Sequence, residues 1–164
     1  PLFDYSTLLE KNLPRRIAKL SKDPAGEGVV LVAYGSEPYQ EEWDAFFTEL
    51  GAVVKRQTGV ALVKHCWCGH VVQYQQQPTE NAIRDVLGEA KRAIVVPVLV
   101  AYDEMFQDRI IGQAVKSLEQ PERVAYVPDA ILPEPALNEW IVSVTAQLRQ
   151  TIREGSPIAQ GEQP

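Results

Sequence analysis

Both histidines and both cysteines of this 164-residue chain lie within six consecutive residues, as His65, Cys66, Cys68 and His70. Thiolate sulfur and imidazole nitrogen are ligands for zinc, iron, nickel, copper and cobalt, so this segment is the strongest candidate for metal chemistry. It follows a short apolar run at residues 60–64, which places it at the C-terminal exit of an expected strand. The four residues either contact a metal or are simply buried there.

The geometry of an extended segment divides these side chains between two faces. Successive residues of a strand point in opposite directions, so His65 and Trp67 face one way and Cys66 and Cys68 the other. All four ligands reach one ion only if the chain bends after Cys66, which Gly69 permits. Otherwise the cysteines form a small apolar pair at a buried strand end, and His65 is hydrogen-bonded in the core.

A second polar group follows the first expected strand, as Tyr34, Gly35 and Ser36. The glycine lets the backbone approach a ligand, and the N-terminus of the next helix can receive a carboxylate or phosphate. A plain turn explains the same residues equally well. The dinucleotide-binding pattern G-x-G-x-x-G is absent, so no nucleotide cofactor is expected.

A third group, Tyr102, Asp103 and Glu104, follows another apolar run. A carboxylate there can accept a proton or bind a cation. The alternative is that Asp103 caps a helix and Glu104 complements its dipole. Met105 and Phe106 then either wall a flat apolar ligand or belong to the core.

The elements that must position these groups alternate along the chain. Apolar runs rich in β-branched residues predict strands at residues 28–34, 60–64, 93–101 and 123–127. Apolar residues at helical spacing predict helices at residues 39–58, 78–90, 102–118 and 137–152. This alternation predicts an α/β fold with a four-stranded parallel sheet and helices on both faces. Ligands of such sheets bind outside the carboxyl ends of the strands, where the three polar groups would meet.

The chain divides into three parts. Residues 1–27 form an N-terminal helical segment, which Pro14 should kink or split into two short pieces. Residues 28–154 form the α/β domain, in which Pro97 indicates a bulge or a lapse in strand pairing. Residues 155–164 are polar and predict a flexible tail.

Composition excludes some partners. The net charge of −6 argues against nucleic acid, because no basic face would neutralise phosphates. No apolar run approaches the roughly 20 residues that span a bilayer. Two cysteines one residue apart are a poor disulfide framework, which favours a reducing compartment, and hence the cytoplasm, or a metal or redox role. The chain begins at Pro1 without a methionine, so a removed leader and a periplasmic location are the alternative.

Four motifs in order resemble the class II chelatases, a family that includes small sirohydrochlorin and cobalt chelatases and the protoporphyrin ferrochelatases. They are V-V-L-V-A-Y-G-S, P-T-E-N-A-I, I-V-V-P-V-L-V-A-Y-D-E-M-F and Y-V-P-D-A-I-L-P-E, across about residues 28–150. The resemblance implies a flavodoxin-like fold and a homodimer. It also implies insertion of cobalt or ferrous iron, with nickel or zinc as further options, into a sirohydrochlorin-type or porphyrin ring.

The resemblance assigns roles residue by residue. Tyr34 stands where the small chelatases carry a histidine and some ferrochelatases a tyrosine at the metal. Their second histidine is absent, so Glu104 is the nearest ligand or base there, with Met105 as the alternative, and His65 and His70 are candidates to replace the pair. The implied catalytic residues are His70, His65 and Glu104. The implied metal ligands are His65, Cys66, Cys68, His70 and Tyr34. The implied ring contacts are Tyr34, Gly35, Ser36, Trp67, Tyr102, Met105 and Phe106, with Tyr74 as a further wall.

Two other interpretations stay open. One is a non-catalytic haem, tetrapyrrole or metal-binding protein on the same fold, since the family's histidines are missing and two soft thiols would retain metal. The other is a structural metal site, which leaves the pocket to an unrelated small anion at the helix N-termini.

Overall fold

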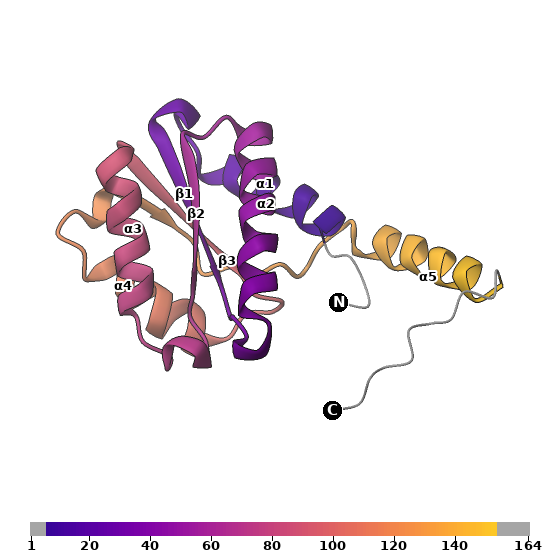
Figure 1. Cartoon of the computed structure of the whole chain (residues 1–164). Helices are drawn as coiled ribbons and strands as arrows, with labels where there is room; N and C mark the ends of the chain where they lie inside the picture. Colours follow the sequence, from indigo (N-terminus) through magenta and orange to yellow (C-terminus); the bar gives the residue numbers. More distant parts are fainter. Residues whose placement is uncertain (1–5, 154–164) are drawn as a thin grey trace.

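The computed structural model of the chain describes residues 6–153 and contains one four-stranded, all-parallel sheet (Figure 1). The strand order is β2-β1-β3-β4. The strands are β1 (Glu27–Ala33), β2 (Leu62–Trp67), β3 (Arg92–Val98) and β4 (Val124–Tyr126). This architecture confirms the predicted α/β fold and is consistent with a single flavodoxin-like domain. The tail expected at residues 155–164 lies outside the described residues.

Helices cover both faces of the sheet, with α1 and α2 on one side and α3 and α4 on the other (Figure 1). The α-helices are α1 (Ser6–Leu20), α2 (Gln40–Thr58), α3 (Gln77–Glu89), α4 (Gln113–Lys116) and α5 (Leu137–Arg153). A π-helix, η4 (Met105–Gly112), precedes α4, and η3 (His70–Val72) is a short 3-10 turn after β2. Within the described part of the chain, no helix is both long and apolar enough to cross a bilayer.

The N-terminal segment forms one helix over its described residues, so the expected split into two pieces is wrong. Helix α1 runs through Pro14 as a single helix rather than as two pieces. Its buried residues Leu13 and Ile17 join the core between the sheet and α2. Packing of this apolar face supplies the stability that one missing helix hydrogen bond removes.

Central strand β1 is buried along its whole length, as a continuous β-branched run predicts for a strand covered on both faces. Val29 and Leu31 pack on the α1 and α2 side, and Val30 and Val32 pack on the α3 and α4 side. This period of two fixes which side chains of the neighbouring strand β2 face each layer.

Pro97 marks a lapse in pairing on one side of β3. The residue keeps its register with β1, but pairing with β4 ends at Val95. The carbonyl oxygen of Pro97 instead accepts a hydrogen bond of 2.7 Å from the buried Arg16 guanidinium of α1, which also pairs with Asp129. Arg16 therefore ties α1 to the exits of β3 and β4, where these two strands are no longer paired with each other.

A buried carboxylate anchors the opposite end of the sheet. Glu27 begins β1 with 2% of its surface exposed, and accepts hydrogen bonds from the Ser21 hydroxyl, the Lys22 backbone N–H and the Arg92 guanidinium. Burial alone would raise the pKa of Glu27, but these hydrogen bonds outweigh it and hold the pKa below the ordinary value of 4.5.

Acid should therefore weaken the fold partly through Glu27. A carboxyl whose pKa is depressed in the folded state stabilises it above the unfolded pKa, and that stabilisation is lost as the pH falls through the folded pKa. We expect Glu27→Gln to lower the free energy of unfolding by about 2 kcal/mol at neutral pH and to flatten its decline below pH 4.5. Urea denaturation at a series of pH values measures both effects. Exposed Glu122→Gln is the control, and parallel pH profiles for Glu27→Gln and wild type would contradict the expectation.

Candidate functional site

Four ring side chains meet at the carboxyl edge of the sheet: Tyr34, His70, Tyr74 and Phe106, here called the edge cluster. Tyr34 is central, with ring centroids 5.4 Å from His70, 5.5 Å from Phe106 and 6.5 Å from Tyr74. Tyr34 follows β1, His70 and Tyr74 follow β2, and Phe106 lies in the π-helix after β3. Topology alone predicts such a meeting of strand exits, and these are the residues that meet.

A glycine lets Tyr34 lie across the exit of β2. The Gly69 N–H donates to the carbonyl oxygen of Tyr34 at 2.9 Å, just beyond the last β1–β2 pair, Ala33 with Trp67. A Cβ atom on Gly69 would lie 2.4 Å from that oxygen and 2.8 Å from Cγ of Tyr34. The φ of Gly69, −90°, is open to any residue, so its backbone conformation does not require glycine. Glycine is required because a Cβ atom would collide with Tyr34.

The Tyr34 and Tyr74 hydroxyls lie 3.2 Å apart and share a hydrogen bond. Tyr74 reaches this position because Gln73 and Tyr74 both adopt left-handed backbone, with φ of 53° and 57°. Such values are uncommon for residues other than glycine and tend to occur where surrounding structure imposes them. The backbone N–H of Tyr74 returns to the Gly69 carbonyl at 3.1 Å, closing the turn.

The edge cluster is open to solvent. Tyr34 is 38% exposed, Tyr74 41% and the neighbouring Met105 44%. The hydrogen bond with Tyr74 raises the pKa of Tyr34 above the ordinary value of 10, so at neutral pH Tyr34 carries its proton. An incoming cation would have to displace that proton, and the exposed imidazole of His70 lies beside the ring.

His65 lies on the other face of the sheet. Its Nε2 atom is 3.0 Å from Oδ1 of Asp44 in α2, and its ring packs on Phe47 and Trp67. The hydrogen bond with His65 holds the pKa of Asp44 below its ordinary value. His65 and Trp67 therefore belong to the α2 side, away from His70. Sequence patterns gave no reason to pair His65 with Asp44, which lies 21 residues earlier.

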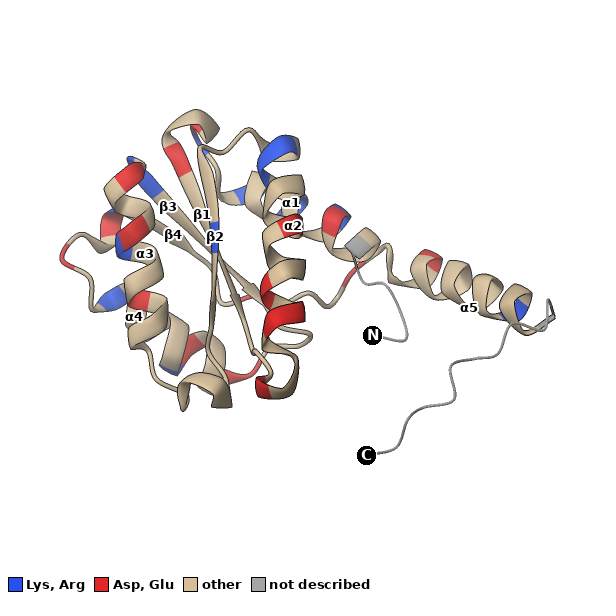
Figure 2. Cartoon of the chain, viewed as in Figure 1, with Lys and Arg blue, Asp and Glu red and all other residues tan. Residues whose placement is uncertain are grey.

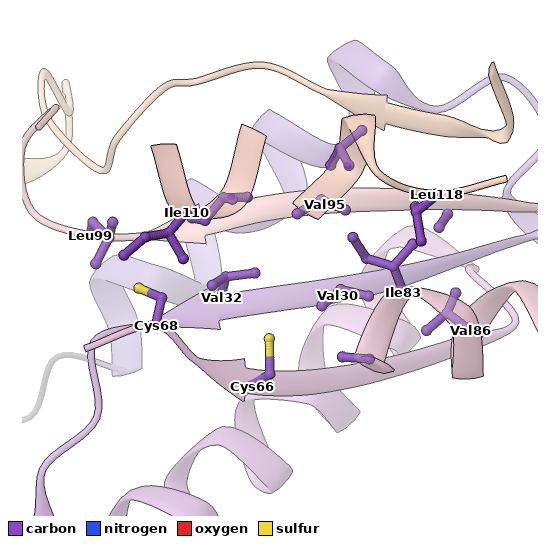
Figure 3. Close-up of a cluster of buried hydrophobic side chains, with 14 of the residues drawn as sticks. Val30, Val32, Cys66, Cys68, Ile83, Val86, Val95, Leu99, Ile110 and Leu118 are labelled. Carbon is purple, nitrogen blue, oxygen red and sulfur yellow. The ribbon is translucent and has the colours of Figure 1, made fainter. Parts of the chain in front are cut away.

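The two cysteines face the hydrophobic core on the α3 and α4 side. Figure 3 shows both sulfur atoms among apolar side chains, including Val30, Val32 and Ile83. Only 8% of Cys66 and none of Cys68 is exposed. Burial raises the pKa of each thiol to about 12. Both thiols thus belong to the hydrophobic core on this side of the sheet.

The structure therefore does not bring His65, Cys66, Cys68 and His70 together around one ion. Strand β2 stays extended through residue 67, so the alternation expected from an extended segment holds and the bend needed for a four-ligand site does not form. Within the described part of the chain, no three or more His, Cys, Asp and Glu side chains are grouped to hold a metal. Of the sequence-predicted metal ligands, His70 and Tyr34 are the pair that remains adjacent.

Gly35 and Ser36 form the turn after β1. Gly35 has a φ of +84°, in the region that favours glycine, and a Cβ atom there would lie 2.6 Å from Cγ2 of Val71. Ser36 precedes the short 3-10 turn η2 (Glu37–Tyr39), and its side chain does not cap that turn. Gly35 thus keeps the β1 and β2 exits in contact, while Ser36 is a turn residue.

The third polar group is engaged in local contacts. Glu104 pairs with Arg109 at 2.9 Å, with both side chains exposed, and the Tyr102 hydroxyl donates to Asp108. Asp103 accepts the Met105 N–H at 2.8 Å, as a helix cap does. Met105 is 44% exposed, so of its two expected places the core is wrong.

The side chains at the start of this segment point in other directions than an α-helix predicts, because the segment is the π-helix η4. Gln107 is fully buried within it, and its amide group reaches the carbonyls of Ala101 and Asp129 and the N–H of Asp103. These contacts fix the exits of β3 and β4 relative to each other. They leave Phe106 against Tyr34 and Met105 exposed beside it. Single π-helical turns occur frequently at functional sites.

A scan against models of protein families found none that matches this chain, and a search of curated proteins found no match either.

Proposed function

We propose that the chain binds a tetrapyrrole at the edge cluster and inserts a divalent metal, cobalt or ferrous iron, into the ring. The observation that supports this most is the placement of one imidazole, His70, beside Tyr34 at an open aromatic edge. A flat macrocycle needs apolar and aromatic surface, which Tyr34, Tyr74, Phe106 and exposed Met105 provide.

Metal insertion exchanges one divalent ion for two protons on pyrrole nitrogens. In the proposed reaction His70 accepts these protons in turn and passes them to solvent, since imidazole accepts and releases protons near neutral pH. Tyr34 is the transient oxygen contact for the metal. Few, weak ligands suit a metal that must be released to the ring, whereas a closed four-ligand cage would retain it.

Other sequence-predicted residues take smaller parts in this proposal. Glu104 is already paired with Arg109, so we assign proton transfer to His70. Tyr102 and Met105 would bound the ring on the π-helix side. His65, Trp67 and the two cysteines act as structural residues of the β2 layers, and no nucleotide cofactor is required. The proposal includes the homodimer that the chelatase resemblance implies.

The test is an anaerobic insertion assay with purified chain, pairing Co²⁺ or Fe²⁺ with sirohydrochlorin or protoporphyrin. Conversion of more than one ring per chain, above the rate with metal and ring alone, supports the proposal. Ring binding without turnover would reject insertion and keep tetrapyrrole binding. Absence of any spectral change in the ring on adding the chain would reject both.

The Tyr34–Tyr74 hydroxyl pair favours a second candidate, a carrier of ferric tetrapyrrole. Tyrosinate is an axial ligand of haem iron in some proteins, and a neighbouring hydroxyl that donates to the bound oxygen would stabilise the phenolate. Ferric protoporphyrin should then bind at one per chain with a tyrosinate-to-iron absorption band. Tyr34→Phe should abolish that band, while Tyr39→Phe, an exposed tyrosine outside the edge cluster, should retain it.

A further inference from the structure

Helix α5 leaves the body beside α1 and extends away from the sheet (Figure 1). Among the described residues, neither hydrophobic core cluster includes a side chain of α5. Four of its large apolar residues are exposed, with fractions of 47% for Ile141, 69% for Val142, 37% for Leu148 and 55% for Ile152. Within the part of the chain that the structure describes, these four side chains are not covered, as on an amphipathic helix whose apolar face packs on a further partner.

The apolar residues of α5 follow a heptad spacing. Leu137, Ile141, Val144 and Leu148 are separated by four, three and four residues, which corresponds to the d, a, d and a positions of a coiled coil. Val142 falls outside this seam, although it is the most exposed of the four exposed apolar residues of α5. The seam thus predicts pairing with another helix along one defined line.

We propose that α5 pairs with α5 of a second copy of this chain in an antiparallel, two-fold symmetric contact. In an antiparallel pair the two seams face each other. Ile141 of one copy packs against Val144 of the other, and Leu148 of one copy packs against Leu137 of the other. Each of the four seam residues then meets another seam residue. A two-fold contact requires such self-complementarity.

Charge favours this occupant and this orientation. Figure 2 shows few charged positions on α5, with acid near its start and base toward its end, and its sequence contains Glu139, Arg149 and Arg153. The positions flanking the seam are uncharged, so no charge there opposes an identical helix: Asn138, Trp140, Thr145, Gln147 and Ile152. A parallel pair would set Glu139 beside Glu139 and align the helix dipoles, whereas an antiparallel pair brings opposite ends together.

The contact should be weak. A helix of 17 residues is about 26 Å long, and one pair of such helices buries less than the roughly 1,600 Å² of a standard stable interface. We expect a dissociation constant on the order of 10 µM, as for transient complexes. This inference gives an interface to the homodimer of the proposed function and rests on that part of it, but it does not depend on tetrapyrrole binding.

Sedimentation of the full chain over a concentration series tests the interface. The wild type should pass from monomer to dimer, and Ile141→Asp and Leu148→Asp should each weaken dimerisation at least about tenfold. Val142→Asp, at a more exposed apolar residue outside the seam, should leave dimerisation unchanged. A monomer at every concentration, or equal weakening by Val142→Asp, would overturn the proposal.

Cysteine crosslinking tests the orientation without a disruptive charge. Ile141→Cys and Val144→Cys chains should crosslink to each other when mixed, faster than either crosslinks to itself. Faster crosslinking within each variant would indicate parallel helices and overturn the antiparallel contact. Cys66 and Cys68 are buried and should not compete, and circular dichroism of each variant checks that the chain is folded.

Discussion

Replacing His70 by alanine should slow metal insertion by about 10²- to 10⁴-fold, the usual contribution of a positioned proton acceptor. His70 is the one imidazole at the edge cluster, since the only other histidine of the chain pairs with Asp44 across the sheet. Initial rates of ring metallation at saturating metal measure the effect. The ring should still bind His70→Ala, because Tyr34, Tyr74 and Phe106 remain.

His65→Ala is the matched control for this variant. It removes the same side chain five residues earlier, from the face that packs on α2. We expect near wild-type rates of insertion and only a modest loss of stability, because the hydrogen bond to exposed Asp44 is partly solvated. The proposed role of His70 would be rejected if His65→Ala abolished turnover and His70→Ala retained it.

Gly69→Ala should both destabilise the chain and disturb the edge cluster. The added Cβ would lie 2.4 Å from the Tyr34 carbonyl oxygen, so the β1 and β2 exits must move apart. Overpacking of this kind costs roughly 1–3 kcal/mol. Tyr34 would also shift away from Tyr74. Chemical denaturation measures the stability, and ring affinity measures the second effect.

Gly88→Ala provides a control of opposite sign. Gly88 lies within α3, and a Cβ added there meets no atom within 4 Å. Alanine should therefore raise stability, by about 0.5–1 kcal/mol at most, through helix propensity. If Gly69→Ala matched Gly88→Ala in stability, the close approach at Tyr34 would not be a constraint.

Periodicity predicted the layers of this fold because burial acts on every residue of an element. The unbroken run Val29 to Val32 indicated a central strand, and it is β1. The alternation from His65 to Cys68 correctly separated the imidazole from the thiols. Pro14 does not split α1 into two pieces, because the packed apolar face of α1 outweighs one lost hydrogen bond.

The location of the candidate site could be predicted from the sequence, but which side chains meet there could be predicted only in part. Topology gave the carboxyl edge and the chelatase resemblance gave Tyr34, but their meeting with His70 depends on where the chain turns after β2. That turn uses left-handed backbone at Gln73 and Tyr74, which residue types do not favour. The Tyr74 hydroxyl contact and the pairing of His65 with Asp44 are tertiary, and no local pattern encodes them.

The buried cysteines have a consequence for how opening of this chain can be followed. Burial raises the pKa of both thiols and keeps them from reagents, and only the thiolate reacts with alkylating reagents. Opening of the core between the sheet and α3 exposes Cys66 and restores an ordinary thiol. The rate at which Cys66 is labelled then measures how often this core layer opens, so the cysteine of β2 reports local unfolding.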